Sequence, residues 1–392
     1  MNKQINSIFL PLFFREGLGA SLLFLGCLLL AACTEAEGLM ERSESTVNFS
    51  LSSDASSPDV VPTRAGAVDM EVGTTVRVLA YRRPDGSGSA VLSSSNYAGE
   101  AVYKVKAGST LELCSVTLDA NGFPSVDAGA TPPPLQLITG TYDFYAVTPA
   151  LDVNHSGSNP TLNVRHRTDY AVSVTSKSIS PGNSTVGLST LERRCTLLSF
   201  STDRKTDATD ITKVVMGEVL LTNMPNEPMQ ATGTGALNVA GNTNGTTFTV
   251  AAANFGIPDN NFPYKAYGET PCLPKSAGKF DLKVNVTLGS ATTPVLLEAK
   301  DLSMSFDEGK HYAFTIRFKS TGIELLIGVA DWTDAIGSTQ IGGSKLPAQI
   351  VVGEWTDVDW STGIGGNKIP PFAPNVDNWS DLNNKLNIGE RV

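Results

Sequence analysis

Short runs in which apolar and polar residues alternate dominate the chain between residues 76 and 329. This two-residue period places one face of a strand in a core and the other face in water, as in antiparallel sheets. The runs are rich in β-branched and aromatic residues and end at Gly, Pro, Asn, Asp or Ser. The clearest lie at 280–288, 312–318 and 323–329, and long amphipathic helical patterns are nearly absent. We therefore predict an all-β fold.

The strand runs fall into two series, which predict two tandem β-sandwich domains at residues 66–190 and 191–335. Residues 33–65 are rich in Ser, Glu, Asp and Pro, as expected for a tether. Within this tether Val47, Phe49 and Leu51 alternate with polar residues, and we predict a short strand there. Residues 336–392 form a tail of different composition, rich in Gly, Asn and Trp.

The N-terminus carries the features of an export signal. An apolar run at 20–30 follows basic residues and is too short to span a bilayer. Ala31 and Ala32 precede Cys33 in a pattern that resembles the bacterial lipobox. We predict that residues 1–32 are a signal peptide and that a lipid on Cys33 anchors the protein in the outer membrane. The acidic residues that follow Cys33 favour the cell surface, and an ordinary signal peptide ending near a cysteine is the alternative.

Charge and cysteine content narrow the possible partners. The formal net charge is −10 and no basic patch appears, which argues against nucleic acid. Cys114, Cys195 and Cys272 are odd in number and widely spaced, unlike an exported disulfide framework. We expect three small apolar residues in strands, and one disulfide plus a free thiol is the alternative.

Signatures of catalysis are weak. The three histidines show no metal-ligand spacing: His155 lies in an expected loop, His166 between two arginines that predict a solvated ring, and His311 at the head of a strand. No nucleophile-elbow or phosphate-loop motif occurs. Residues 357–363 resemble the start of a calcium loop, but the glycine is misplaced and the closing glutamate is missing. We predict no enzyme, no cofactor and no metal site, with a hydrolase built on paired carboxylates as a minor alternative.

All four tryptophans lie at or after residue 332. Aromatic rings stack on sugars and anchor protein interfaces. Trp355, Trp360 and Trp379 are therefore candidate contacts with a glycan or a protein ligand on a host or bacterial surface. Packing of the tail on the second domain through these same side chains is the alternative.

Several short motifs, in their order along the chain, resemble the fimbrillin superfamily, the subunits of type V pili in Gram-negative anaerobes. The motifs are Cys33 in its lipobox, Thr63-Arg64-Ala65, Gly-Thr-Tyr-Asp-Phe-Tyr-Ala-Val at 140–147, Thr168-Asp169-Tyr170, Leu191-Glu192-Arg193-Arg194, and Gly309-Lys310-His311-Tyr312 ahead of strands that end at Trp332. The resemblance covers residues 33–332 and implies two transthyretin-like β-sandwiches.

The resemblance also implies a mode of assembly. In that family an arginine-directed protease removes the lipidated N-terminus with the first strand, and another subunit donates a strand to the vacated groove. The matching processing site here is Arg64, and Val47, Phe49 and Leu51 belong to the exchanged strand. Other pilus subunits, joined by strand addition, are the implied partners. Candidate donor strands lie in the tail at 349–352 and 382–388.

The sequence leaves the position in such a pilus open. Three roles fit the sequence: a stalk subunit, an anchor that keeps its lipid and first strand, and a tip or accessory subunit that supports adhesion. The alternative of a different class is a non-polymerising surface lipoprotein that binds glycans or a protein partner through its aromatic tail.

Overall fold

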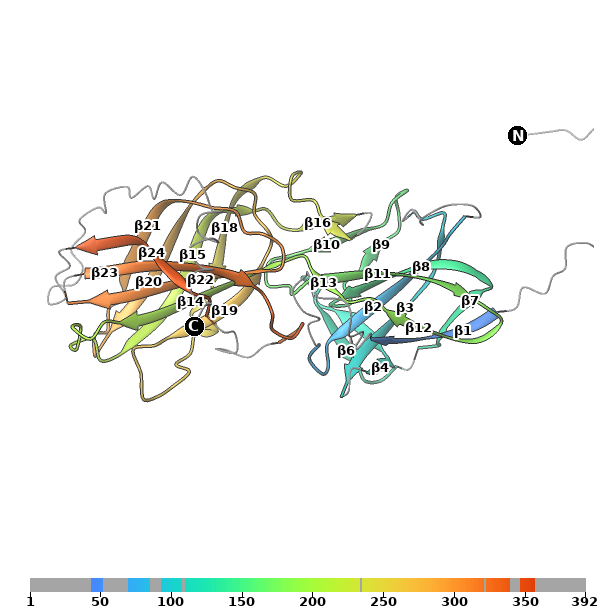
Figure 1. Ribbon diagram of the computed structural model, residues 1–392, viewed down its shortest axis with the longest axis horizontal. Coiled ribbons are helices and arrows are strands. Elements are labelled where there is room, and N and C mark those ends of the chain that lie inside the picture. The colour runs from blue at the N-terminus through green and yellow to red at the C-terminus, as the bar shows by residue number, and fades with distance from the viewer. Residues whose placement is uncertain are drawn as a thin grey trace, which may run out of the picture.

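A computed structural model describes residues 44–51, 70–84, 93–107, 110–130, 132–232, 235–320, 322–338 and 346–356. Two β-sandwiches follow one another along the long axis of the molecule (Figure 1). The described residues include a single helical element, the 3-10 turn η1 (Ala252–Asn254). Within these ranges no helix has the length and hydropathy needed to span a membrane. The predicted fold, all-β with two tandem sandwiches, is confirmed.

The first sandwich packs a six-stranded sheet against a three-stranded sheet. The larger sheet runs in the order β13 (Glu192–Arg193), β11 (Ala171–Ile179), β8 (Gly140–Thr148), β2 (Thr75–Arg82), β3 (Tyr97–Lys106), β4 (Thr110–Leu113). The smaller sheet runs in the order β12 (Gly182–Leu188), β1 (Glu44–Leu51), β7 (Leu135–Ile138). A separate hairpin is formed by β5 (Ser115–Leu118) and β6 (Pro124–Asp127).

A further small sheet covers the outer face of the six-stranded sheet. Its order is β17 (Ala236–Leu237), β16 (Met229–Thr232), β10 (Thr161–Val164), β9 (Val153–Asn154). Both faces of β2 are therefore buried, with Val76 and Val78 in one core and Leu79 and Tyr81 in the other. The expected wet face is wrong for this strand, because alternation shows that the two faces differ but does not show what covers each of them.

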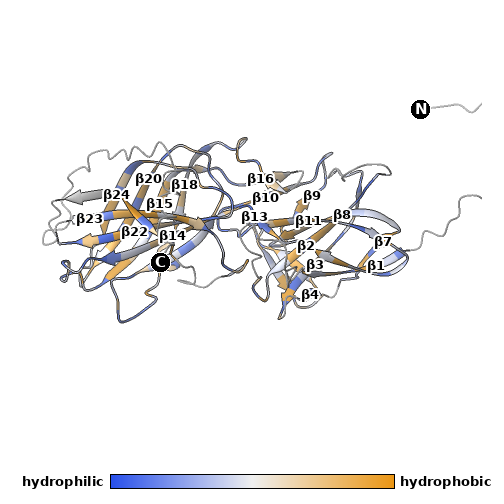
Figure 2. Ribbon diagram, in the orientation of Figure 1, coloured by the Kyte–Doolittle hydropathy of each residue, from blue (hydrophilic) through white to orange (hydrophobic). Residues whose placement is uncertain are grey.

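The second sandwich packs a five-stranded sheet against a four-stranded sheet. The first runs in the order β19 (Tyr267–Cys272), β14 (Thr196–Arg204), β22 (Lys310–Lys319), β23 (Gly322–Asp331), β24 (Gln349–Thr356). The second runs in the order β18 (Asn244–Val250), β15 (Val214–Pro225), β20 (Lys279–Leu288), β21 (Val295–Ser303). Figure 2 shows apolar residues concentrated along the strands of both sandwiches.

Aromatic rings fill the centre of the second core. Phe200 and Phe314 stack with ring centroids 5.3 Å apart, and Phe280 meets Phe306 edge to face at 5.4 Å. All four side chains are buried. Burial of each contributes about 1.5–3 kcal/mol, and ring pairs of this geometry add about 0.5–1.5 kcal/mol. This core holds together strands that are far apart in the sequence.

The predicted boundary at residue 190 falls between β12 and β13. Contacts cross this position, since β13 pairs with β11 and β16 pairs with β10. The two sandwiches therefore share a sheet and part of a core, and the limits of the domains stay a prediction.

The structure corrects the expectation for His166. Its ring is 3 % exposed and stacks on Phe248 with centroids 4.5 Å apart. Arg167 stays exposed and Arg165 half-buried, because the chain turns at His166 and Arg167, where Arg167 has a φ of 69°, and the turn directs the ring of His166 inward. Charged flanking residues therefore say little about the residue between them.

Cys114, Cys195 and Cys272 are free and buried, as expected for small apolar residues, so the disulfide alternative is wrong. The expected strand position is correct for Cys272 in β19 and wrong for Cys114 and Cys195, which lie between strands. Burial raises the pKa of each thiol. These cysteines are consequently poor nucleophiles.

His311 gives the protein an acid-sensitive core. Burial lowers its pKa to about 4, and Ser199 Oγ lies 2.7 Å from its Nε2. An unfolded histidine has a pKa of about 6.5, so on acidification the unfolded state takes up the proton first. Stability that is complete above pH ~6.5 is lost as the pH falls towards ~4, by up to about 3 kcal/mol. We predict that His311→Gln removes most of this loss.

The measurement is the free energy of urea unfolding at pH 7.5 and pH 4.5 for the wild type and His311→Gln. Burial lowers the pKa of His166 as well, so the variant should keep a smaller slope of the same sign. An equal loss of stability in both proteins would contradict the assignment.

Candidate functional site

Strand β1 is the middle strand of the smaller sheet of the first sandwich, at the end of the molecule (Figure 1). It runs parallel to β12, with Phe49 opposite Val186, and antiparallel to β7, with Val47 opposite Leu135. Its backbone is thus paired with β12 over residues 45–51 and with β7 over residues 44–47. Because the strand pairs with distant segments on both sides, its place in the fold is set by tertiary contacts.

The inward side chains of β1 complete the first core. Val47 is fully buried and Phe49 is 6 % exposed, while Leu51 packs on the same core and is partly buried. The Phe49 ring lies edge-on to Tyr103 and Phe144, with centroids 5.6 and 5.2 Å away. The three residues predicted for the exchanged strand therefore share one core-facing side.

Polar contacts fix the register of β1 relative to its neighbours. Ser45 Oγ donates to the carbonyl of Ser180, and Gln136 Nε2 donates to Thr46 Oγ1 over 2.9 Å. Asn48 and Ser50 point outward and are exposed. Loss of β1 would leave the facing edges of β12 and β7 unpaired beside an apolar slot, which is the arrangement that accepts an added strand.

Strand β24 is an edge strand of the second sandwich. It pairs antiparallel with β23 on one side and has no neighbour in the described sheet on the other. Val352 is buried and Ile350 packs on the second core, whereas Val351 is 50 % exposed. The first candidate donor, 349–352, thus already has one apolar and one exposed face.

Other predicted site residues lie elsewhere. Trp355 stands opposite Ile323 in the pairing of β24 with β23. Cys33, Arg64, Trp360, Trp379 and the candidate donor 382–388 are outside the described residues. The sequence therefore remains the only basis for their proposed roles.

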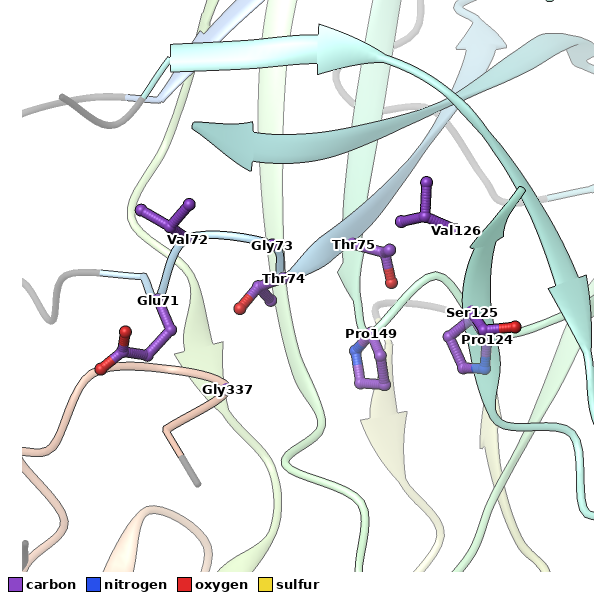
Figure 3. Close-up of a pocket in the computed structure, with 10 residues that line it drawn as sticks. All are labelled: Glu71, Val72, Gly73, Thr74, Thr75, Pro124, Ser125, Val126, Pro149 and Gly337. Carbon is purple, nitrogen blue, oxygen red and sulfur yellow. The ribbon is translucent and has the colours of Figure 1, made fainter. Parts of the chain in front are cut away.

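A hollow of about 500 Å³ lies at the start of β2 (Figure 3). It is lined by Glu71, Val72, Gly73, Thr74, Thr75, Pro124, Ser125, Val126, Pro149 and Gly337. Glu71 is the one carboxylate in this lining, so the hollow lacks the paired acids that a hydrolase requires. In the described part of the chain no three His, Cys, Asp or Glu side chains are grouped to hold a metal ion.

Sequence reasoning did not find the contacts of Arg193 and Ile336. Arg193 forms a bidentate ion pair with Asp169, and Ile336 is buried in the first core although it follows the last strand of the second series. The motifs containing Asp169 and Arg193 were visible in the sequence, but their pairing across 24 residues was not.

Comparison with protein families decides which kind of protein this fold and this strand arrangement belong to. A family model described as fimbrillin-like matches residues 34–336. The chain belongs to the fimbrillin-like family. This family is structural, and membership supports a pilus or adhesin-like role at the cell surface. No curated protein matches the chain.

Several solved structures are similar to this fimbrillin-like chain. A candidate cell adhesion protein from Bacteroides fragilis is 16 % identical, with a TM-score of 0.48 over 75 % of this chain and 99 % of that one. A fimbrial assembly protein from Parabacteroides distasonis is 11 % identical, with a TM-score of 0.36 over 73 % and 94 %. The tip fimbrial protein Mfa3 from Porphyromonas gingivalis, truncated at its C-terminus, is 10 % identical, with a TM-score of 0.38 over 74 % and 100 %.

The packing of Phe49 predicts a large effect of truncation. Phe49→Ala should lower the free energy of unfolding of the first sandwich by about 3–5 kcal/mol, because it opens a cavity between Tyr103 and Phe144. Ser50→Ala, on the exposed side of the same strand, is the matched control and should stay within about 0.5 kcal/mol of the wild type. Urea unfolding followed by circular dichroism measures both, and similar values for the two variants would refute the role of β1 in the core.

Proposed function

We propose that the protein is a pilus subunit that joins other subunits by exchanging β1 for a strand of a neighbouring molecule. The observation that carries the proposal is the position of β1. It is the first strand of the described chain, it fills the middle of a sheet, and its inward side chains complete a core. Membership of the fimbrillin-like family supports an assembly role.

Removal of β1 is the first step of the proposed assembly. Arg64 lies in the Ser- and Pro-rich segment between β1 and β2, and a cut after Arg64 separates β1 from the rest of the chain. The departing strand takes Val47 and Phe49 out of the core. Two or three replacement side chains at ~1.5–3 kcal/mol each give the incoming strand on the order of 3–9 kcal/mol before ordering costs.

The tail is the proposed source of the incoming strand. Ile350 and Val352 on β24 provide alternating apolar side chains, and β24 is held on one edge only. Its release from β23 therefore requires one set of backbone pairs to be broken. In a neighbouring subunit the strand would gain pairs on two edges, with β12 and with β7, which favours the exchange.

The proposed route to the surface begins with export. Residues 1–32 would act as the signal peptide, and lipid on Cys33 would hold the precursor in the outer membrane until β1 is released. A subunit that is not cut keeps both the lipid and β1, and would serve as an anchor. Processing of Arg64 thus distinguishes the two positions in a pilus.

Cleavage of the purified precursor by an arginine-specific protease tests the proposal. We expect a new N-terminus at Ala65, identified by mass spectrometry, followed by a ladder of oligomers that resists detergent. Arg64→Gln should retain β1, whether or not Arg42 ahead of it is cut, and should stay monomeric. A protein that is cut after Arg64 and remains monomeric at every concentration would rule out the proposed exchange.

A matched pair of variants checks the donor in the same assay. Val352→Asp places a charge on the apolar face of β24 and should abolish the ladder, because burial of an unpaired carboxylate is costly. Val351→Asp places the same charge on the exposed face and should leave the ladder intact. Equal ladders from both variants would exclude β24 as the donor.

A further inference from the structure

The chain crosses from the second sandwich to the first directly after β23. We call residues 332–337 the interdomain strap; it leads from the end of β23 towards the first sandwich (Figure 1). Two of its side chains are buried in different cores. Ile336 is 1 % exposed in the core that also holds Val47 and Phe49, and Trp332 is 7 % exposed in the core beneath β9 and β10. The strap is thus fixed by apolar packing at both ends.

Arg193 holds the strap by its polar groups. Its Nε and Nη2 donate to the two carboxylate oxygens of Asp169 over 2.9 and 3.0 Å. Its Nη1 donates to the carbonyls of Trp332 and Asp334 over 3.2 and 2.6 Å. The guanidinium carbon also lies 3.9 Å from the centre of the Trp332 ring. A bidentate, charge-assisted pair with a stacked ring is among the strongest polar arrangements a protein builds.

Asp169 links this cluster to the far end of the strap. Its Oδ2 accepts the backbone N–H of Gly337 over 2.8 Å. Gly337 has a φ of 83°, and a Cβ there would lie 2.3 Å from Thr74 Oγ1, so glycine is required on steric grounds. In Figure 3 the backbone at Gly337 passes beside Glu71 at the edge of the hollow. The end of the strap therefore packs against Thr74, directly before the first residue of β2.

The strap also holds the chain that precedes β2. Met70 forms a parallel bridge with Ile336, and the N–H of Glu71 donates to the Ile336 carbonyl over 2.9 Å. Met70 is buried in the same core as Ile336. The segment that carries Arg64 thus ends at Met70 beside the strap, and the strap also precedes the part of the chain that carries β24.

We propose that the interdomain strap is a fixed junction that keeps the two sandwiches aligned while β1 and β24 change partners. Arg193 and Asp169 are its positioning residues. The part that concerns strand exchange rests on the proposed function, whereas the alignment of the sandwiches does not. The strap sets the limits of both movements: release of the tail stops at Gly337, and the N-terminal segment that remains after the cut at Arg64 is held from Met70 onward.

Distances between the two sandwiches in the full mature chain test the junction. Spin labels at Lys177→Cys and Ser303→Cys, one exposed position in each sandwich, report the distance distribution by electron paramagnetic resonance. The three buried cysteines are shielded from labelling, and Cys33→Ser removes the remaining thiol. We expect a narrow distribution in the otherwise unaltered chain and at least a twofold broader one in Arg193→Met. Asp169→Asn, which keeps an acceptor for Gly337 N–H, should broaden it less.

Arg83→Met is the matched control. Arg83 also forms a bidentate pair with a buried carboxylate, that of Asp143, but within the first sandwich alone. This variant should leave the interdomain distribution narrow. Unchanged distributions in both Arg193→Met and Asp169→Asn would overturn the proposal, as would equal broadening in Arg83→Met.

The same labels separate the junction from strand exchange. Cleavage at Arg64 and the Val352→Asp variant should each leave the distance distribution narrow, because neither touches the strap. Broadening after either change would show that the strap does not limit the movement. The distances are measured within single labelled molecules diluted into unlabelled protein, so the result does not depend on whether oligomers form.

Discussion

The first sandwich depends on the insertion of β1 between β12 and β7. Val47 and Phe49 reach from this strand into a core that the other strands cannot close, and both of its edges are paired. The strand is nonetheless peripheral in the chain, since it precedes every other described element. A terminal strand can leave without drawing a loop through the fold, so the same position that makes β1 important for stability also makes it removable.

The C-terminal strand has the complementary property. β24 is paired on one edge only, so its release breaks fewer backbone pairs than the loss of a central strand. The strap lies between these two strands in the sequence. It is held by the buried side chains of Trp332 and Ile336 and by the ion pair of Arg193 with Asp169. A removable first strand, a β24 held on one edge and a firmly held junction all fit the proposed exchange of strands between subunits.

Alternation predicts where the strands lie, but the expected wet face is wrong for β22 and β23 as well as for β2, since both faces of these strands are largely buried. Alternation placed Val47 and Phe49 on the core side of a strand and found β20, whose burial follows the same period. The fimbrillin resemblance, drawn from the order of short motifs, is confirmed by the family match over residues 34–336. These features are predictable because each strand pattern and each motif consists of residues that are close together in the sequence.

Features set by distant partners were not predictable. Three examples depend on segments far away in the chain: burial of the second face of β2, the inward orientation of the His166 ring, and the packing of Ile336 in the first core. Flanking charges even pointed the wrong way for His166. The roles of Cys33, Arg64, Trp360 and Trp379 stay predictions, because they rest on local sequence alone.

In the proposed exchange β1 must leave before subunits can join, and a disulfide can prevent that step. Asn48 and Thr185 are exposed and pair across β1 and β12, and neighbouring strands lie about 4.8 Å apart, within reach of a disulfide. Asn48→Cys with Thr185→Cys would lock β1 in place even after Arg64 is cut. We predict that the cut, oxidised protein stays monomeric and forms oligomers on reduction. Equal assembly of the oxidised and reduced forms would contradict strand exchange at this site.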